Sequence, residues 1–551
     1  MKYSKLCLIL LFTSFSFLMI ASYTTHIQIY PPDPFYLFFS LPIYYWIGIL
    51  ILIVAILIRI IVDIEITKTD TFIDIAILGL TTFYYSITTF VYPTIRYVDT
   101  YYLYWYLLNP VISAGTINIP VNYSPMYYTI FNASTIFFAY IFQFNLSPSI
   151  VANSFPILVI STGSIITYIL CMKYSGRYAL IGGLFFILFN WDACHLAPQH
   201  YSYILSFLIL FLIVILLIKK KKEKIIYFIP LLILLVVITL SHLLASIILL
   251  YFFVSIFIIF IICELLFGRL KYLLNPIKDY CNQKKIILLP TFFLFIAFIT
   301  YMIFIGIYYF QKLATFSNVV FSSFFEYHQI NLVHRAVLHT IPSSLYMDVY
   351  YIRISVLFSY LILSVIFSLI IIYIYLKQPS AIKKISYVIF MIIALFVLFS
   401  FGGILLATGN ATYGYERSYP LSLIFFGVLA SVIFSLNNSL NKVISVLKKI
   451  IVIFIVILII LLPIIKYGSD PYHFFSESED KANQFGINHI EKFEMTLYEN
   501  NTFSIMTYND KALEDQAGLQ QYLNKFNNKS LNKIYDVGKT CKIYLDFTQS
   551  I

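Results

Sequence analysis

The chain has little charge and no ordered arrangement of cysteines, and these absences already exclude several classes of protein. Only 11% of its 551 residues are charged, against about one quarter in an ordinary globular protein. Its six cysteines are scattered, without the spacing of a disulfide framework or a zinc site. No Walker loop, dinucleotide-binding fingerprint or convincing internal repeat is present. The sequence therefore gives no sign of a nucleotide-binding or zinc-stabilised fold.

Apolar residues, in contrast, are abundant and are gathered into long runs. Hydrophobic residues make up 61% of the chain and aromatic residues 19%, and many runs are long enough for a helix to cross a bilayer. Unpaired backbone amides in lipid cost several kcal/mol, so such runs must form helices or a closed barrel. The runs do not alternate polar and apolar residues, which excludes the barrel. The sequence predicts an all-α polytopic membrane protein.

We expect about 13–14 membrane helices, all within a domain of residues 1–467. The first run follows Lys2 and Lys5 but lacks a small-x-small cleavage site, so we interpret it as a retained helix or signal anchor. The predicted spans are residues 5–22, 41–63, 72–92, 125–143, 148–172, 178–191, 200–218, 225–241, 243–266, 286–309, 353–376, 384–407, 418–436 and 447–466.

Lysine and arginine are concentrated in a few of the joints between these runs. The basic joints are residues 219–224, 269–285, 377–384 and 442–449, and the positive-inside rule makes them cytoplasmic. The net charge of +11 is then a topology signal and an anionic-lipid contact, with no nucleic-acid partner. We expect an integral protein of the plasma membrane. The opposite, external side then receives the loop around Asp99, the segments 192–200, 311–352 and 409–417, and the tail from 468.

Two local features complicate this simple alternation. If the runs 125–143 and 148–172 both cross fully, Lys173 and Arg177 become external, so one of these runs, or 178–191, should be tilted, re-entrant or incomplete. The tail 468–551 is mainly polar, with β-prone stretches at 503–506 and 542–545. Its length of roughly 80 residues is marginal for an independent core, and we expect a small external α+β domain.

Polar side chains beside membrane helices are costly, and they are the candidates for function. Asp99 lies in a charged, aromatic stretch between apolar runs. An isolated acid of this kind would be a solvated loop residue or the partner of Arg96, three residues away. Here Tyr102 follows it, and Tyr123 opens a Tyr-x-Pro turn before the next run, so we interpret Asp99 as a reactive group.

A second polar cluster lies on the same predicted face. Asp192, His195, Gln199 and His200 fall between two apolar runs, where they could bind sugar hydroxyls, assist proton transfer or hold a metal. The alternative is that Asp192 and Gln199 only begin the next helix. His242 interrupts another apolar stretch. It either belongs to the site or makes a hydrogen bond between helices.

Two basic candidates complete the set. Arg335 lies in the long loop 311–352, and Arg417 follows Glu416 at the start of a late helix. A guanidinium is always charged and can bind a phosphate through two parallel hydrogen bonds. The alternative interpretations are a solvated loop residue for Arg335 and an interfacial pair with Glu416 for Arg417.

The segments 99–104 (DTYYLY) and 123–125 (YSP) resemble the first external loop of the GT-C superfamily of membrane glycosyltransferases. The resemblance implies sugar transfer from a polyprenyl-phosphate donor to an external acceptor protein, lipid or glycan, with Asp99 as the base or acceptor-orienting residue. The substrate-binding residues that it implies are Arg96, Tyr102, Tyr123, Asp192, His195, Gln199, His200, His242, Arg335, Glu416 and Arg417.

The resemblance has one departure, and it leaves alternatives open. Many superfamily members carry a second acid beside the first, whereas Asp99 precedes Thr100 and Tyr101. This argues against a divalent metal, whose candidate ligands would be Asp99 and Asp192. A transporter or flippase of lipid-linked glycans would also explain the basic loops, although no charged group at the membrane midplane supports it. A non-catalytic scaffold is the remaining alternative.

Overall fold

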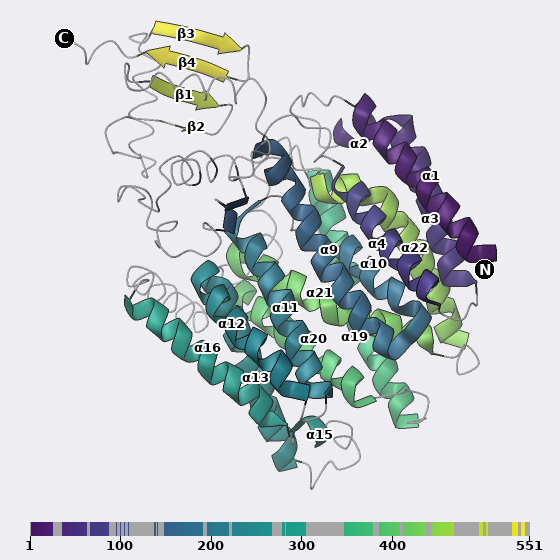
Figure 1. The fold of residues 1–551 in the computed structure, drawn as a ribbon, viewed down its shortest axis with the longest axis vertical. Coiled ribbons are helices and arrows are strands. Elements are labelled where there is room, and N and C mark those ends of the chain that lie inside the picture. The colour runs from purple at the N-terminus through teal and green to yellow at the C-terminus, as the bar shows by residue number, and fades with distance from the viewer. Residues whose placement is uncertain are drawn as a thin grey trace.

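The structure is a computed structural model, and it describes most of the helical part of the chain together with four strands (Figure 1). The described residues are 2–25, 36–62, 67–87, 148–190, 196–219, 223–266, 278–281, 283–304, 347–377, 385–407, 411–436, 442–467, 495–499, 503–504, 532–537, 541–545 and single positions at 95, 100, 104, 108, 137, 138, 140 and 141.

Long apolar helices dominate the described residues, as the composition predicts. They are α1 (Lys2–Thr24), α2 (Tyr36–Ser40), α3 (Ile43–Ile61), α4 (Lys68–Tyr85), α9 (Pro148–Ser175), α10 (Ala179–Phe189), α11 (Pro198–Ile218), α12 (Lys224–Ser241), α13 (Leu243–Leu266), α15 (Lys278–Cys281), α16 (Lys284–Phe304), α19 (Met347–Lys377), α20 (Ile385–Ala407), α21 (Ala411–Ser435) and α22 (Lys442–Tyr467), with a 3-10 turn η3 (Gly176–Tyr178).

Eleven segments among the described residues are long and apolar enough to cross a membrane. The chain is therefore a multi-pass helical membrane protein. Ten of the predicted spans correspond to separate segments, and the eleventh segment, Pro148–Phe189, contains both α9 and α10. Most of the predicted span 125–143 lies outside the described residues. The predicted span 72–92 corresponds to α4, which is not among the eleven.

The predicted irregularity near Arg177 corresponds to a short helix. The helix α10 has 11 residues, all of them buried, and so it is about 16 Å long, half the thickness of a bilayer core of about 30 Å. It packs against α9, to which η3 joins it, and against α21. At its crossing with α21, a Cβ on Gly182 would lie 2.8 Å from the carbonyl oxygen of Gly427. Two glycines thus allow a close helix contact, as is common in membranes.

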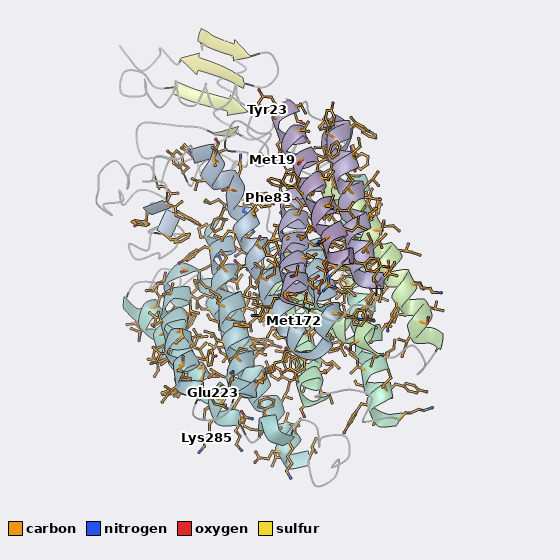
Figure 2. All side chains as sticks on the ribbon, turned by 45° about the vertical axis from the view of Figure 1, so that its right-hand side comes forward. Met19, Tyr23, Phe83, Met172, Glu223 and Lys285 are labelled. Atoms are coloured by element: carbon orange, nitrogen blue, oxygen red, sulfur yellow. The ribbon has the colours of Figure 1, made fainter. Side chains whose placement is uncertain are left out.

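The helix ends separate the molecule into two faces, which we call the basic end and the opposite end. Figure 2 shows Tyr23 and Phe83, near the last turns of α1 and α4, toward the top of the molecule, and Glu223 and Lys285 toward the bottom. The bottom is the basic end. Glu223 and Lys285 belong to two of the basic joints of the sequence, and the alternation of the helices brings the end of α9 to the same end.

Four strands lie in the tail: β1 (Met495–Glu499), β2 (Phe503–Ser504), β3 (Asn532–Val537) and β4 (Cys541–Leu545). They form an antiparallel sheet in the order β2-β1-β4-β3, with Leu497 opposite Ser504 and Ile543. The sheet lies beyond the opposite end of the helices (Figure 1). The helical component predicted for the tail falls outside the described residues, so the α+β assignment stays a prediction.

Candidate functional site

A small cavity opens where α11, the α12–α13 joint and α21 meet. Its enclosed part has room for about one water molecule, so a head group would bind here only after the lining side chains move apart. Its lining residues are Gln199, Ser202, Tyr203, Ser206, His242, Ala245, Ile248, Arg417 and Leu421.

The polar wall of the cavity comes from one face of α11. Pro198 stands at the first helical position of α11, where its missing N–H costs nothing. Gln199, Ser202, Tyr203 and Ser206 follow at the three- and four-residue spacing that brings side chains onto one face. The Gln199 amide donates to the Tyr203 hydroxyl, and the Ser206 hydroxyl donates to the Ser202 carbonyl at 2.8 Å. These bonds satisfy the polar groups within an apolar helix.

The single-residue joint between α12 and α13 supplies His242. Its backbone N–H donates to the Ile238 carbonyl at 3.1 Å and so ends α12. Its Nδ1 accepts from the backbone N–H of Ala245 at 3.4 Å, a side-chain cap on the first turn of α13. The imidazole is thereby fixed at the cavity, between two membrane spans.

The protonation of His242 determines what it can offer a ligand. Its burial and the neighbouring Arg417 guanidinium lower the pKa of His242 to about 3, so the imidazole is neutral. A neutral imidazole has one acceptor nitrogen. It can accept from Ala245 through Nδ1 or from Arg417 through Nε2, which lies 3.5 Å from the guanidinium Nη1, but not from both.

The arrangement of these two residues suits an oxygen acceptor. When Nδ1 accepts from Ala245, Nε2 carries the proton, and both His242 and Arg417 present N–H groups at the cavity. An anionic or carbonyl oxygen within reach of both groups would accept a hydrogen bond from each. The cavity is therefore a candidate site for a phosphate or similar oxyanion.

Hydrogen bonds near the start of α21 hold Arg417 in position. The Tyr419 hydroxyl donates to the Phe189 carbonyl at the end of α10. One turn further on, Ser422 and the buried Tyr360 of α19 share a hydrogen bond of 2.6 Å. These contacts tie the helix that carries Arg417 to two neighbouring helices, so its guanidinium projects from a fixed backbone.

The residue after Asp99 lies against the start of α11. The Thr100 hydroxyl donates to the Leu196 carbonyl at 2.8 Å, and Thr100 is buried. Leu196 immediately precedes the residues that begin α11. Two segments that are about 96 positions apart in the sequence therefore meet beside the polar wall. Asp99 itself lies outside the described residues.

The structure brings together three of the residues predicted from the sequence: Gln199, His242 and Arg417 all line the cavity. His200 is buried beside Tyr203, with ring centroids 5.5 Å apart, and is not a lining residue. Glu416 belongs to α21, but its side chain is outside the description. The predicted residues that lie outside the described part of the chain are Arg96, Asp99, Tyr102, Tyr123, Asp192, His195 and Arg335.

Sequence reasoning missed Ser202, Tyr203 and Ser206 as lining residues. Their signal is the periodic polar stripe that continues from Gln199 into an otherwise apolar helix. Both candidate metal ligands, Asp99 and Asp192, lie outside the described residues. Within the described part of the chain, no three His, Cys, Asp or Glu residues are grouped as a metal site would require.

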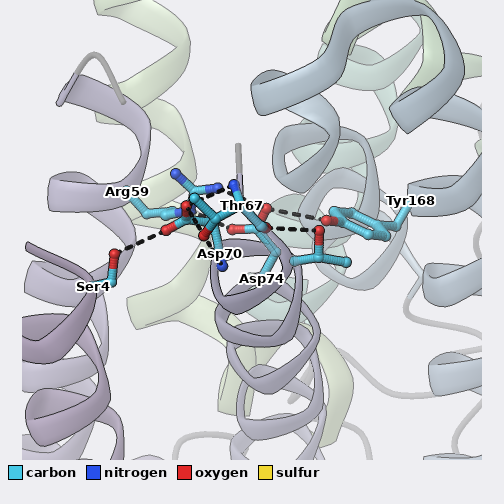
Figure 3. A network of polar contacts seen from close by, with 7 residues as sticks. Ser4, Arg59, Thr67, Asp70, Asp74 and Tyr168 are labelled. Carbon is cyan, nitrogen blue, oxygen red and sulfur yellow. Dashed lines mark hydrogen bonds and ion pairs between the residues drawn. The ribbon is translucent and has the colours of Figure 1, made fainter. Parts of the chain in front are cut away.

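Sequence reasoning also missed a buried ionic network at the basic end (Figure 3). The Arg59 guanidinium donates to both carboxylate oxygens of Asp74, at 2.6 and 3.2 Å, and both side chains are almost fully buried. The Tyr168 hydroxyl donates to the same carboxylate at 3.1 Å. Because each charge is compensated and hydrogen-bonded, this group joins α3, α4 and α9 rather than forming an open site.

A second acid extends this network to the first helix. The Asp70 carboxylate accepts from the backbone N–H of Thr67 at 2.9 Å, and the Thr67 hydroxyl accepts from the backbone N–H of Asp70 at 3.2 Å; these two bonds form the capping box of α4. The Asp70 carboxylate also accepts from the Ser4 hydroxyl of α1 at 3.1 Å. This hydrogen bond ties the first turn of α1 to the start of α4.

Comparison with known proteins adds no family to this description. No family model matches the chain, and no curated protein sequence matches it. Function must therefore be argued from the chemistry of the site.

Proposed function

We propose that the chain is a membrane glycosyltransferase that moves a sugar from a polyprenyl-phosphate donor to an acceptor at the opposite end of the molecule. The observation that carries the proposal is the meeting of Gln199, His242 and Arg417 at one cavity. These residues come from three separate elements. Each is costly in an apolar environment, and their convergence favours a shared ligand over three unrelated structural roles.

The donor phosphate is assigned to Arg417 and His242. Negative charge grows on the phosphate as the sugar leaves, so donors already aimed at its oxygens stabilise the transition state. Arg417 supplies the charge, and the Nε2–H of neutral His242 supplies a second donor. Gln199 and the hydroxyls of α11 are assigned to the sugar, because amide and hydroxyl groups can both donate to and accept from sugar hydroxyls.

The acceptor is assigned to Asp99, which would remove or orient its proton. The hydrogen bond from Thr100 to Leu196 supports this assignment, because it holds the chain next to Asp99 beside the start of α11. In this proposal the donor's head group binds at the residues that line the cavity, and its hydrocarbon tail remains among the apolar helix surfaces.

Transfer can be measured with the full chain in proteoliposomes, using a polyprenyl-phosphate donor with a radiolabelled sugar and a membrane extract as the acceptor source. We expect the label to move to a protein, lipid or glycan. The variant Asp99→Asn should lose about 10²–10⁴-fold in rate, the usual contribution of a general base. Glu223→Gln is the matched control, because it removes an exposed carboxylate at the basic end.

The outcomes separate the candidate functions. Normal transfer by Asp99→Asn would exclude the acid from the mechanism, while transfer lost equally in Glu223→Gln would indicate a general effect of charge. Movement of the intact donor across the membrane without bond cleavage would favour the transporter alternative. If the chain neither transferred the sugar nor bound the donor, the non-catalytic scaffold would be the remaining alternative.

A further inference from the structure

A second cationic cluster lies at the basic end, around the ring of Tyr178 in the η3 turn. The Arg177 guanidinium carbon is 4.5 Å from the centroid of this ring, and the Lys448 ammonium of α22 is 5.8 Å from it. Arg177 also donates to the Tyr178 hydroxyl. We call Arg177, Tyr178 and Lys448 the Tyr178 cluster.

The backbone around the Tyr178 cluster is tied to neighbouring helices. Gly176 has a φ of 54°, a conformation that glycine adopts without strain, and it turns the chain sharply between α9 and α10. The Ser431 hydroxyl of α21 donates to the Tyr178 carbonyl at 3.0 Å. The Lys448 ammonium donates to the Leu436 carbonyl just beyond the end of α21. The two cations are thus held by three different elements.

This arrangement concentrates positive charge. Both cations stand over one ring, so they are at most about 10 Å apart, close to the Debye length in physiological salt. Both are only partly exposed, which weakens screening further. The surrounding segments 148–191 and 418–469 contain no Asp or Glu. An anion bound here would relieve the repulsion between the two cations.

The surface beside the Tyr178 cluster exposes apolar side chains. On α9, the exposed side chains of Ile165 and Ile169 form a line that ends at exposed Lys173, because residues four apart share a helix face. On α22, exposed Ile450 and Ile453 lie on the face that carries exposed Lys449. An exposed apolar line that ends in a lysine, as on α9, matches the boundary between acyl chains and head groups.

We propose that the Tyr178 cluster binds the phosphate of an anionic phospholipid from the leaflet at the basic end. Arg177 and Lys448 contact the phosphate, and Lys173 and Lys449 add charge at its margin. Basic pockets between membrane helices on this side are suited to anionic head groups. The site is separate from the cavity at Arg417, since it lies at the other end of the helices.

The test titrates the purified full chain in detergent with phosphatidylglycerol or with phosphatidylcholine of the same acyl chains, and counts bound lipids by native mass spectrometry. We expect phosphatidylglycerol to bind preferentially. The double variant Arg177→Gln/Lys448→Gln should bind it about 30-fold more weakly, from about 1 kcal/mol per cation. The control pair Lys285→Gln/Lys377→Gln removes the same charge from exposed positions, one of them also over a tyrosine ring, and should change binding less than about twofold.

Two further measurements make the result decisive. The charge-conserving pair Arg177→Lys/Lys448→Arg should keep most of the binding, which separates lost charge from lost folding. Lys173→Gln/Lys449→Gln alters only exposed side chains and should produce a smaller loss. Equal binding of the two lipids, an equal loss in the control pair, or displacement of the lipid by millimolar inorganic phosphate would each overturn the proposal, the last in favour of a soluble phosphate ligand.

Discussion

The two polar groups built around Arg59 and Arg417 differ in their surroundings. Arg59 is enclosed with the carboxylate of Asp74, which also accepts from Tyr168. Arg417 borders a cavity that a neutral histidine and the hydroxyls of α11 also line. An arginine enclosed with a carboxylate of the same chain holds helices together, whereas we propose that the arginine at the cavity binds a ligand.

The largest effect should come from breaking the pair at the basic end. Arg59→Met leaves Asp74 buried without its counter-charge, and we expect a loss of about 3–5 kcal/mol in the free energy of unfolding. The double variant Arg59→Met/Asp74→Leu removes both charges and should recover most of the lost free energy of unfolding. Denaturant unfolding in detergent measures both variants. If the double variant were as unstable as the single one, the network would not be a compensated pair.

At the cavity we expect the opposite result, a large loss of activity with little loss of stability. Arg417→Gln should lower sugar transfer by about 10²–10³-fold, as removal of an oxyanion donor does, while the free energy of unfolding changes by less than about 1 kcal/mol. Arg417→Lys keeps the charge but cannot donate two parallel hydrogen bonds. Its transfer rate should therefore lie between those of the unmodified chain and Arg417→Gln. Rates in proteoliposomes and unfolding in detergent are the two readouts. A large loss of stability with unchanged transfer would make Arg417 structural.

The contrast also explains which features could be predicted from sequence. The membrane helices were predictable because lipid forces backbone amides to pair within each apolar run. Gln199, His242 and Arg417 were recognised because each interrupts or borders such a run. Ser202 and Ser206 were missed because a serine hydroxyl can bond to its own helix, as Ser206 does, and so carries little cost.

Other features depend on three-dimensional contacts that periodicity does not reveal. The pairing of Arg59 with Asp74 joins two helices across a joint, and each residue alone resembles an ordinary charge near a helix end. The helix α10 (Ala179–Phe189) lies within the predicted span 178–191, but the sequence did not indicate which of the three neighbouring runs would be the incomplete one. Its end at Phe189 is set by packing, including the hydrogen bond from Tyr419.

His242 should show a smaller effect that depends on pH. Its pKa in the folded protein is about 3, against 6.5 for the free side chain. Between these values the unfolded chain binds a proton that the folded chain does not. Stability should therefore be fully present above pH 6.5 and fall as the pH is lowered toward 3. The variant His242→Asn can still accept a hydrogen bond from the Ala245 N–H, but it does not titrate. The part of the pH dependence of the unfolding free energy that is due to His242 should therefore disappear. An unchanged slope of unfolding free energy against pH would show that His242 is protonated in the folded protein.

The smallest effects should come from the serines of α11, and they separate a lined cavity from a packing defect. Ser206→Ala removes a hydroxyl bonded to its own helix, so stability should change by less than about 1 kcal/mol and transfer only slightly. Ser206→Leu adds side-chain volume at the cavity wall and should raise the KM for the donor. Leu208, partly buried on the same helix, gives the control Leu208→Ile. If Ser206→Leu stabilised the protein and left the KM unchanged, the space beside Arg417 would be an unfilled gap between helices, and the donor would bind elsewhere.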